Sequence, residues 1–549
     1  MSFSTRQRRS TTSDSSQPSK PESYTKADKP GRSSSSSNGR EESGNDRGLA
    51  WFTALFALGM MILRFALYGR SRFALRSYLY IVFHEVVGRP ASWLFAYEKV
   101  RVFYAVRIFL GLLSVISDAT LVIAVSRKYG KYLAFYALAM LCLASGCFFA
   151  STSFLPSSLS MYAMSLSSGL FLLDKPAQAV AVAAVGVILG WPFSILAFLP
   201  VMLFSLSKQF KQPFLSGAVT SIALLVLSIL VDYYYYQRWT SSVFNFLVHN
   251  VLGGGESHLY GTEGPLFYLR NGFNNFNFCF IFALLFLSIL PIVWRKYAPD
   301  LLIVVSPLYI WLAFMSLQSH KEERFLYPVY PLVCLAASAV IESFPDLVRD
   351  KYSPYDKSTI VVIAKVLRPG ALCLILCASH ARTFSLINGY AAPFEVYKIL
   401  DHYDDAGTGS VLCVGSEWHR FPSSFFVPDF IGEVRWINDG FQGLLPFPFN
   451  ATLGGTSAAP PYFNDKNKAS HEQYLEDLQA CSFLVELQLD RPYHYRGNDL
   501  STWEAVAALP YLDREVSPAK YRSFFIPYLW EQKNVFGTYK LLKRMSKPK

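Results

Sequence analysis

Residues 301–340 read LLIVVSPLYIWLAFMSLQSHKEERFLYPVYPLVCLAASAV, and this stretch decides the fold. Two long apolar runs, 301–317 and 325–340, enclose the charged block His320-Lys321-Glu322-Glu323-Arg324-Phe325. Each run is close to the ~20 apolar residues that a bilayer-spanning helix needs. The charged block is therefore held at one membrane surface between two helices. Charge so close to hydrocarbon is costly and usually functional, so we favour a site for an anionic group over a loop ion cluster.

The composition extends this prediction to most of the chain. Hydrophobic residues make up 52% of the 549 residues and charged residues only 16%, against about 25% charged residues in a soluble protein. A polytopic, all-α membrane part is therefore expected. The formal net charge of +12 would indicate nucleic acid in a soluble protein. Here the basic residues fall in short loops between apolar runs, where membrane topology explains them, so we expect contact with membrane lipid and no nucleic acid.

The apolar runs predict about eleven membrane-spanning helices. Two of them, at 158–173 and 177–190, are short for a span. The break at Gly190-Trp191-Pro192 predicts a tight turn or kink between two runs. The expected spans are 49–68, 102–126, 132–150, 158–173, 177–190, 192–206, 214–234, 278–294, 299–318, 325–343 and 359–379.

Basic residues in the loops orient these helices. The loops on one side carry Arg127, Lys128, Lys131, Lys175, Lys208, Lys211, Arg295, Lys296, Arg349 and Lys351. The positive-inside rule makes that side cytosolic, which places 69–101, 235–277, 319–324 and everything after 380 in the lumen. Lys321 and Arg324 break the rule there, which is a further indication of function. The sequon Asn450-Ala451-Thr452, a glycosylation signal, falls on the same lumenal side.

The chain divides into three regions. Residues 1–48 are rich in serine and lack apolar periodicity, which predicts a disordered cytosolic tail. Residues 49–379 hold the predicted helices. Residues 380–549 mix short apolar runs with Gly, Pro and Asp breaks, which predicts a lumenal mixed α/β domain. If that domain is lumenal, Cys413 and Cys481 could pair there.

The charged block has the chemistry of a phosphate site. Arg324 can bind a phosphate through two parallel hydrogen bonds, and Lys321 and His320 supply further positive charge. Such groups stabilise the charge that develops on a departing phosphate. Glu322 and Glu323 would support these cations, or one of them would act on an acceptor hydroxyl.

A second predicted lumenal loop carries His249, Tyr260 and Glu263 among further aromatic residues. Rings stack on sugar faces while acids and amides take hydroxyl groups, so the loop is a candidate for acceptor or sugar binding. The alternative is an interfacial aromatic belt. Asp118, inside the run 102–126, is expected to face the protein interior, and structural and functional roles both stay open for it.

The charged block is similar to the signature of glycosyltransferase family 22, mannosyltransferases of the endoplasmic reticulum lumen. Tyr260-Gly261-Thr262-Glu263 and the stretch 413–426, CVGSEWHRFPSSFF, resemble the branch that acts on the lipid-linked oligosaccharide for N-glycosylation, and within it the α-1,2-mannosyltransferases. The resemblance covers about residues 75–540. It implies a GT-C fold, a multi-pass position in the endoplasmic reticulum membrane and a lumenal active site.

The resemblance also implies a reaction. Mannose moves from dolichyl-phosphate mannose to a dolichyl-diphosphate oligosaccharide with inversion, so the β-linked donor gives an α-1,2 product. Inversion fits one displacement in which a carboxylate takes the acceptor proton. The resemblance implies no cofactor and no metal. A mannosyltransferase of the glycosylphosphatidylinositol anchor is the alternative within the family, and a transporter is a weaker alternative outside it.

The carboxylate that the family uses is missing from its expected place. The family carries an acidic motif in its first lumenal loop, but no acid lies between Asp46 and Glu85 in this chain. The first predicted span is also short, because only fifteen uncharged residues, 49–63, precede Arg64. A missing internal segment explains both observations. The catalytic base is therefore unknown, with Glu85 and Asp118 as weak substitutes, and a catalytically impaired form is an alternative function.

Overall fold

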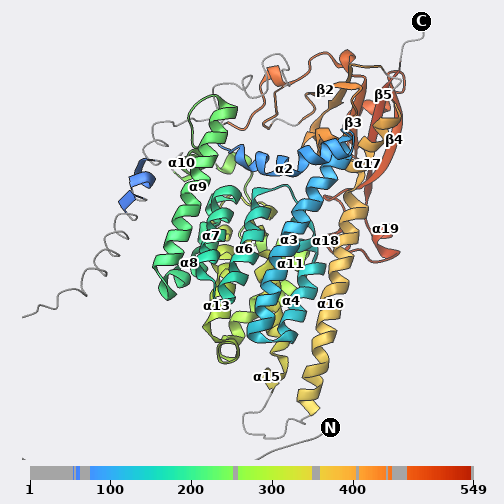
Figure 1. Cartoon of the computed structure of the whole chain (residues 1–549). Helices are drawn as coiled ribbons and strands as arrows, with labels where there is room; N and C mark the ends of the chain where they lie inside the picture. Colours follow the sequence, from blue (N-terminus) through green and yellow to red (C-terminus); the bar gives the residue numbers. More distant parts are fainter. Residues whose placement is uncertain are drawn as a thin grey trace, which may run out of the picture. The chain divides into compact units, whose positions relative to one another are not determined.

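The computed structural model describes residues 53–54, 57–61, 74–251, 257–348, 359–403, 407–440, 443–447 and 466–545. Residues 57–549 belong to one compact unit, which is mostly helical with a small sheet (Figure 1). The predicted tail, most of the first predicted span and the sequon at Asn450 lie outside the described residues.

The helices follow the apolar runs. Their bounds are α2 Leu79–Leu94, α3 Lys99–Tyr129, α4 Lys131–Leu143, α5 Ser145–Ala150, α6 Pro156–Leu172, α7 Pro176–Val185, α8 Ile195–Lys208, α9 Lys211–Tyr236, α10 Ser242–Val251, α11 Phe267–Phe276, α12 Phe278–Leu285, α13 Leu290–Leu317, α14 Tyr330–Glu342, α15 Phe344–Val348, α16 Thr359–Tyr390, α17 Ala392–Ile399, α18 Ala519–Ser523 and α19 Leu529–Lys533. In the described part of the chain, six stretches are long and apolar enough to cross a membrane: Lys99–Tyr129, Lys211–Tyr236, Phe278–Tyr297, Pro299–Leu317, Glu323–Glu342 and Val362–Tyr390. Figure 1 shows α2 lying across the bundle that these helices form.

Three details refine the predicted spans. The predicted kink at Gly190-Trp191-Pro192 is confirmed, because a π-helix ends at Gly190 and a 3-10 turn begins at Pro192. The predicted loop at 295–298 is wrong, because these residues lie inside the continuous helix α13. Arg295 is exposed on the surface of this helix, so its charge can be accommodated without a break in the helix. Helix α16 runs to Tyr390, beyond the predicted end at 379.

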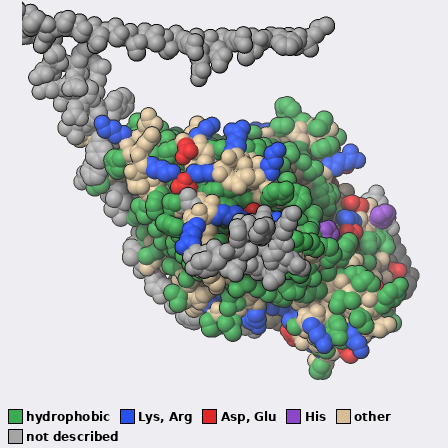
Figure 2. Space-filling model, turned by 90° about the horizontal axis from the view of Figure 1, so that it is seen from below, with side chains coloured by type: hydrophobic (Ala, Val, Ile, Leu, Met, Phe, Trp, Pro, Cys, Tyr) green, Lys and Arg blue, Asp and Glu red, His purple; other side chains and the backbone are tan. Residues whose placement is uncertain are grey.

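We call the end of the bundle where α3 ends and α4 begins the far end. This end carries ion pairs between helices. Lys128 and Lys208 both pair with Asp300 of α13. Lys296 pairs with Glu342 and Asp346. Figure 2 shows lysine and arginine side chains gathered on this end, seen from below. The basic residues Lys128, Lys208 and Lys296, which the sequence groups on one side, therefore lie at the same end of the bundle.

A five-stranded sheet lies at the opposite end of the bundle, which we call the near end (Figure 1). Its strands are β1 Ser410–Val414, β2 Ile431–Trp436, β3 Phe483–Gln488, β4 Trp503–Leu512 and β5 Phe536–Arg544, in the order β2-β1-β3-β5-β4. Strands β2 and β3 run parallel to β1, whereas β5 is antiparallel to both β3 and β4. Four strands therefore point in one direction, and their carboxyl ends share one edge. The predicted mixture of helix and strand in this region is confirmed.

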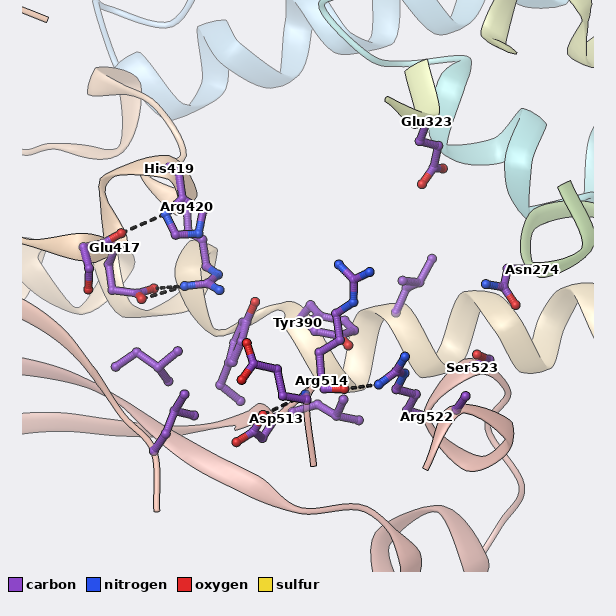
Figure 3. A pocket seen from close by; sticks show the side chains of 18 of the residues that line it. Asn274, Glu323, Tyr390, Glu417, His419, Arg420, Asp513, Arg514, Arg522 and Ser523 are labelled. Carbon is purple, nitrogen blue, oxygen red and sulfur yellow. Dashed lines mark hydrogen bonds and ion pairs between the residues drawn. The ribbon is translucent and has the colours of Figure 1, made fainter. Parts of the chain in front are cut away.

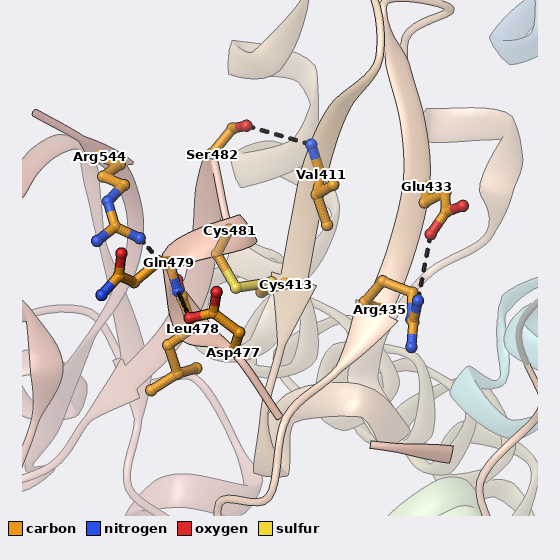
Figure 4. Close-up of a disulfide and its surroundings, with 10 residues drawn as sticks. All are labelled: Val411, Cys413, Glu433, Arg435, Asp477, Leu478, Gln479, Cys481, Ser482 and Arg544. Carbon is orange, nitrogen blue, oxygen red and sulfur yellow. Dashed lines mark hydrogen bonds and ion pairs between the residues drawn. A yellow bond between two sulfur atoms is a disulfide. The ribbon is translucent and has the colours of Figure 1, made fainter. Parts of the chain in front are cut away.

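A disulfide joins Cys413 of β1 to Cys481, which precedes β3 (Figure 4). Both cysteines are buried, in a small apolar cluster with Leu484 and Leu542. The predicted pairing is confirmed. Because β1 and β3 are neighbours in the sheet, the disulfide closes the long connection between two adjacent strands.

Candidate active site

The charged block is held by the loop that precedes α11. Lys321 is buried, and its ammonium group donates hydrogen bonds to the carbonyl oxygens of Glu263, at 2.8 Å, and Gln318. His320 Nδ1 donates to the carbonyl oxygen of Gly261 at 2.9 Å. The structure therefore brings together two stretches that the sequence identifies separately.

Three charged groups of the block form one cluster. Glu322 Oε1 accepts hydrogen bonds from His320 Nε2, at 3.1 Å, and from Arg324 Nη2, at 2.7 Å. Burial opposes ionisation of Glu322, but His320 and Arg324 outweigh it and hold the pKa of this carboxyl below its ordinary value. The hydrogen bond to Glu322 raises the pKa of His320. Both ring nitrogens of His320 face oxygen acceptors, which favours the charged imidazolium.

Arg76 adds another cation to this cluster. Its guanidinium lies 4.8 Å from the ring centre of Phe246. Burial lowers the pKa of Arg76, and the nearby charge of Arg324 lowers it further. The next residue, Ser77, is tied to α9 by a hydrogen bond from its hydroxyl to Asp232 at 3.0 Å. Arg76 therefore interacts electrostatically with Arg324 of the charged block.

Glu323 differs from its neighbour Glu322. Its carboxylate accepts hydrogen bonds from the amide groups of Asn275, at 2.8 Å, and Asn271, at 3.5 Å. Among the described residues no cation lies within ion-pair distance of it. Figure 3 shows this carboxylate facing an open cavity. Glu323 is thus a positioned acid that is not neutralised by an arginine or lysine.

The cavity has a volume of about 1770 Å³ and lies between the helices and the sheet. The membrane-side wall consists of the loop before α11, α11 itself, the two glutamates of the charged block and the last turns of α16. The other wall comes from the carboxyl ends of four strands. Asp439 follows β2, Glu417 follows β1, Arg491 follows β3 and Asp513 follows β4. Ligands of sheets with parallel strands bind outside these ends.

Aromatic and paired charged groups cover the sheet-side wall. Arg420 binds both carboxylate oxygens of the buried Glu417, at 2.6 and 2.7 Å. Its guanidinium also lies 5.1 Å from the ring centre of Tyr511. The rings of Tyr511 and Tyr390 meet edge to face at 5.3 Å. Tyrosine rings beside acids and arginines are the groups that a sugar chain needs for stacking and hydrogen bonding.

The remaining predicted residues lie in different places. Tyr260 lies near His320, with 6.1 Å between ring centres, and Glu263 lines the cavity. His249 lies near the end of α10 and is not among the described residues that line the cavity. Glu85 pairs with Arg89 one turn away on α2.

Asp118 lies inside the bundle, where Ser165 of α6 donates a hydrogen bond to it at 2.6 Å. Neither Asp118 nor Glu85 is among the described residues that line the cavity. The two acids that the sequence offers as substitutes for the family base are therefore not brought to the charged block. Among the described residues, no group of three or more potential metal ligands is found.

Sequence reasoning missed several residues of the cavity and its rim. Glu417 and Arg420 lie in the stretch that carries the resemblance, but nothing in the sequence predicts their pairing or their position. Arg76 could have been noticed as a basic residue in a predicted lumenal loop. Arg382 lies just past the predicted end of the last span, where a continued helix would have placed it.

Comparisons with known proteins agree with the resemblance. The model of the Alg9-like mannosyltransferase family matches residues 70–428. "Alpha-1,2-mannosyltransferase ALG9" of Arabidopsis thaliana is 66% identical over 572 residues, which cover 99% of each chain. The human protein of the same description is 34% identical over 493 residues, which cover 86% of this chain and 80% of that protein.

A solved structure, ArnT from Cupriavidus metallidurans bound to undecaprenyl phosphate, matches with a TM-score of 0.44 and 12% identity, over 67% of this chain and 77% of that chain. The Arabidopsis alignment has a further feature. It runs over 572 positions against the 549 residues of this chain, so at least 23 residues of that relative have no counterpart here.

Proposed function

The chain belongs to the Alg9-like mannosyltransferase family and is a glycosyltransferase of the membrane, and from this we propose that it transfers mannose, with inversion, from dolichyl-phosphate mannose to a dolichyl-diphosphate oligosaccharide. The product linkage is α-1,2, and the reaction takes place in the endoplasmic reticulum lumen during assembly of the N-glycan precursor. One observation carries the proposal. The charged block and the loop before α11 meet at the wall of a cavity that Glu323 faces.

The donor phosphate binds at the cation cluster of the charged block. Arg324 and His320 present N–H groups around a single carboxylate, Glu322, so the cluster keeps net positive charge. These groups stabilise the phosphate as it leaves. Lys321 adds charge, and its hydrogen bonds to backbone carbonyl groups fix the path of the block. Arg76 is a further candidate for this phosphate.

Glu323 takes the proton from the acceptor hydroxyl. Glu322 is paired with two cations through Oε1, which lowers its basicity, whereas amide groups hold Glu323 in position without neutralising it. A carboxylate on the cavity side of the donor suits a single displacement with inversion. Tyr260, Glu263 and His249 stay candidates for sugar contact, together with Tyr390 and Tyr511 on the cavity wall.

The membrane part has the GT-C type of fold with about eleven spans, and residues 380–549 are lumenal. Two observations support this orientation. The basic loops gather at the far end, where the positive-inside rule places the cytosol. The disulfide of Cys413 with Cys481 lies at the near end, and disulfides persist in the oxidising lumen. The division at 1–48, 49–379 and 380–549 remains our proposal for the domains.

We infer from two observations that an internal segment is missing, which favours a second function. The Arabidopsis relative has at least 23 residues without counterpart here. In this chain no acid precedes Glu85 in the first predicted loop. Because Arg76 interacts electrostatically with the charged block, we infer that a segment lost before it would affect the site. This form would then bind the lipid-linked donor with impaired transfer.

Microsomes that lack the endogenous enzyme test both proposals. Radiolabelled dolichyl-phosphate mannose and the truncated lipid-linked acceptor are supplied to this chain and to a form in which the relative's residues between positions 63 and 73 are restored. Arg324→Ala is made in each. Transfer by the chain as it stands, abolished by Arg324→Ala, supports the first proposal and contradicts impairment. Transfer only after restoration supports impairment. If neither stably inserted form transfers mannose, the proposed function is wrong.

A further inference from the structure

The arginines of the cavity fall into two groups. Some have acidic partners: Arg270 lies 3.9 Å from Glu263, Arg420 lies 2.6 Å from Glu417 and Arg491 lies 2.9 Å from Asp513. Three others, Arg382, Arg514 and Arg522, line the same cavity and have no carboxylate within ion-pair distance among the described residues. Figure 3 shows Arg514 and Arg522 close together on the wall that faces Glu323.

Backbone carbonyl groups, rather than acids, accept hydrogen bonds from two of these guanidinium groups, those of Arg382 and Arg522. Arg382 donates a hydrogen bond to the carbonyl oxygen of Ser523 at 3.2 Å. Arg522 donates to the carbonyl oxygens of Ser517, at 3.2 Å, and Arg514. Arg382 Nε is buried and has no hydrogen-bond partner. Arg382 is repelled by Arg514 and Arg522, and Glu323 is the acid that attracts it. Like charges are thus concentrated, and among the described residues no carboxylate lies within ion-pair distance of them.

The cluster lies near the end of a helix that is long and apolar enough to cross a membrane. Arg382 belongs to the membrane-crossing stretch Val362–Tyr390 and lies eight residues before its end, about 12 Å at the helical rise. Phe384 and Ile387 on the same helix are about half exposed, which suits contact with lipid. An anionic group that enters the cavity from the membrane surface would therefore meet these arginines.

We propose that Arg382, Arg514 and Arg522 bind the diphosphate of the acceptor lipid, which deepens the proposed function and rests on it. Guanidinium groups bind phosphate oxygens through parallel hydrogen bonds, and three of them match a diphosphate better than a single phosphate. The donor phosphate has its own cations in the charged block across the cavity. A diphosphate on this wall directs its sugar chain past Tyr390 and Tyr511 into the cavity, toward Glu323.

Lipid binding by the purified full-length chain in nanodiscs tests the proposal. The two probes are a polyprenyl diphosphate that carries chitobiose and a polyprenyl monophosphate, both titrated by microscale thermophoresis. The variants are Arg514→Gln, which changes an exposed side chain, and the double variant Arg382→Gln with Arg522→Gln. Lys520→Gln is the matched control, because Lys520 also lines the cavity but lies over the ring of Tyr521.

We expect affinity for the diphosphate lipid to fall about tenfold for Arg514→Gln and about 100-fold for the double variant, from about tenfold per charged contact. Affinity for the monophosphate lipid and the binding by Lys520→Gln should stay within about threefold of wild type. Unchanged diphosphate binding in a folded Arg514→Gln protein and in a folded double variant contradicts the proposal. Equal loss for both lipids contradicts it too, since the cluster would then not be selective for the acceptor. A wild-type chain that binds neither lipid overturns the proposed function itself.

Discussion

The two ends of the helical bundle carry similar residues and arrange them differently. At the far end, lysines meet acids from other helices, as in the pairing of Lys128 and Lys208 with Asp300. At the near end, Arg382, Arg514 and Arg522 face a cavity, and none of them has an acidic partner within ion-pair distance in the part of the chain that the structure describes. The cations of the far end link helices to one another, whereas those of the near end are directed at a space that a ligand can fill. What distinguishes the structural end from the functional end is therefore whether the basic residues have acidic partners, more than how many basic residues there are.

The largest expected difference between the two ends is in catalysis. Glu323→Gln should lower kcat about 1000-fold in a form that transfers mannose, because general base catalysis contributes about 100- to 10000-fold. Glu342→Gln is the matched change at the far end, where Glu342 pairs with Lys296. It should leave kcat within about threefold and affect stability only. The measurement is single-turnover transfer at saturating donor and acceptor. An equal effect of both substitutions on the rate would contradict this comparison.

The next largest effect separates paired from unpaired arginines within the cavity. Arg420→Met leaves the buried Glu417 without its partner, and such a loss costs about 3 kcal/mol of folding free energy. Resistance of the region after residue 390 to proteolysis, followed with temperature, measures the change. Adding Glu417→Gln to Arg420→Met should restore part of the stability. If Arg420→Met alone is as stable as wild type, the pair does not hold this wall in place.

At the far end, Lys128→Met should cost about 1 kcal/mol, because the pair with Asp300 is only partly buried and Lys208 remains within 3.5 Å of the same carboxylate. Thermal unfolding in detergent measures this change, and transfer activity at a permissive temperature should be unaffected. A loss of transfer without a loss of stability would mean that the far end also takes part in function.

A smaller effect concerns pH at the charged block. The pKa of His320 is raised above its ordinary value of 6.5, so the stabilisation from its pairing is complete below about pH 6.5 and is lost as the pH rises through the raised value. The pKa of Glu322 is lowered, so its contribution is lost only as the pH falls through that lowered value. The difference in melting temperature between wild type and His320→Gln should therefore shrink from pH 6 to pH 9. A constant difference over that range would show that His320 does not titrate as proposed.

The smallest expected effect has the opposite sign. Arg514→Gln should leave the free energy of unfolding within about 0.5 kcal/mol of wild type and raise it slightly, since it removes repulsion from Arg382. A clear loss of stability in a thermal melt would show that Arg514 is a structural group. A slight gain in stability together with weaker lipid binding would be the pattern of a ligand site.

The sequence predicts the helical part well, because a spanning helix is encoded by a local run of apolar residues. It also predicts the charged block, since six adjacent residues hold its chemistry. It could not predict the sheet-side wall of the cavity. Arg382 and Arg522 are far apart in the chain and meet only because α16 docks on the segment before α19, where Phe525 N donates to the carbonyl oxygen of Ala381 at 2.8 Å. Such pairings have no local signal.

The two glutamates show the same limit on a smaller scale. Glu322 and Glu323 are adjacent and chemically equivalent in the sequence, and only the structure distinguishes them. The 3-10 turn that begins at Glu323 directs one side chain toward Arg324 and the other toward Asn275 of α11. The partner of each acid is thus decided by packing between elements, which residue type alone does not encode.

The strand order has a consequence for the biogenesis of the protein. Strand β5 follows β4 in the chain but lies between β3 and β4 in the sheet. During synthesis the helices before the sheet and β1 to β3 are made first, and β4 has no neighbour in the sheet until residues 536–544 have been made. The wall that carries Arg514 therefore forms last, after the ribosome has passed the entire membrane part. A premature stop codon that removes only β5 would leave an inserted bundle with an open sheet edge, and such an edge is a substrate for chaperones.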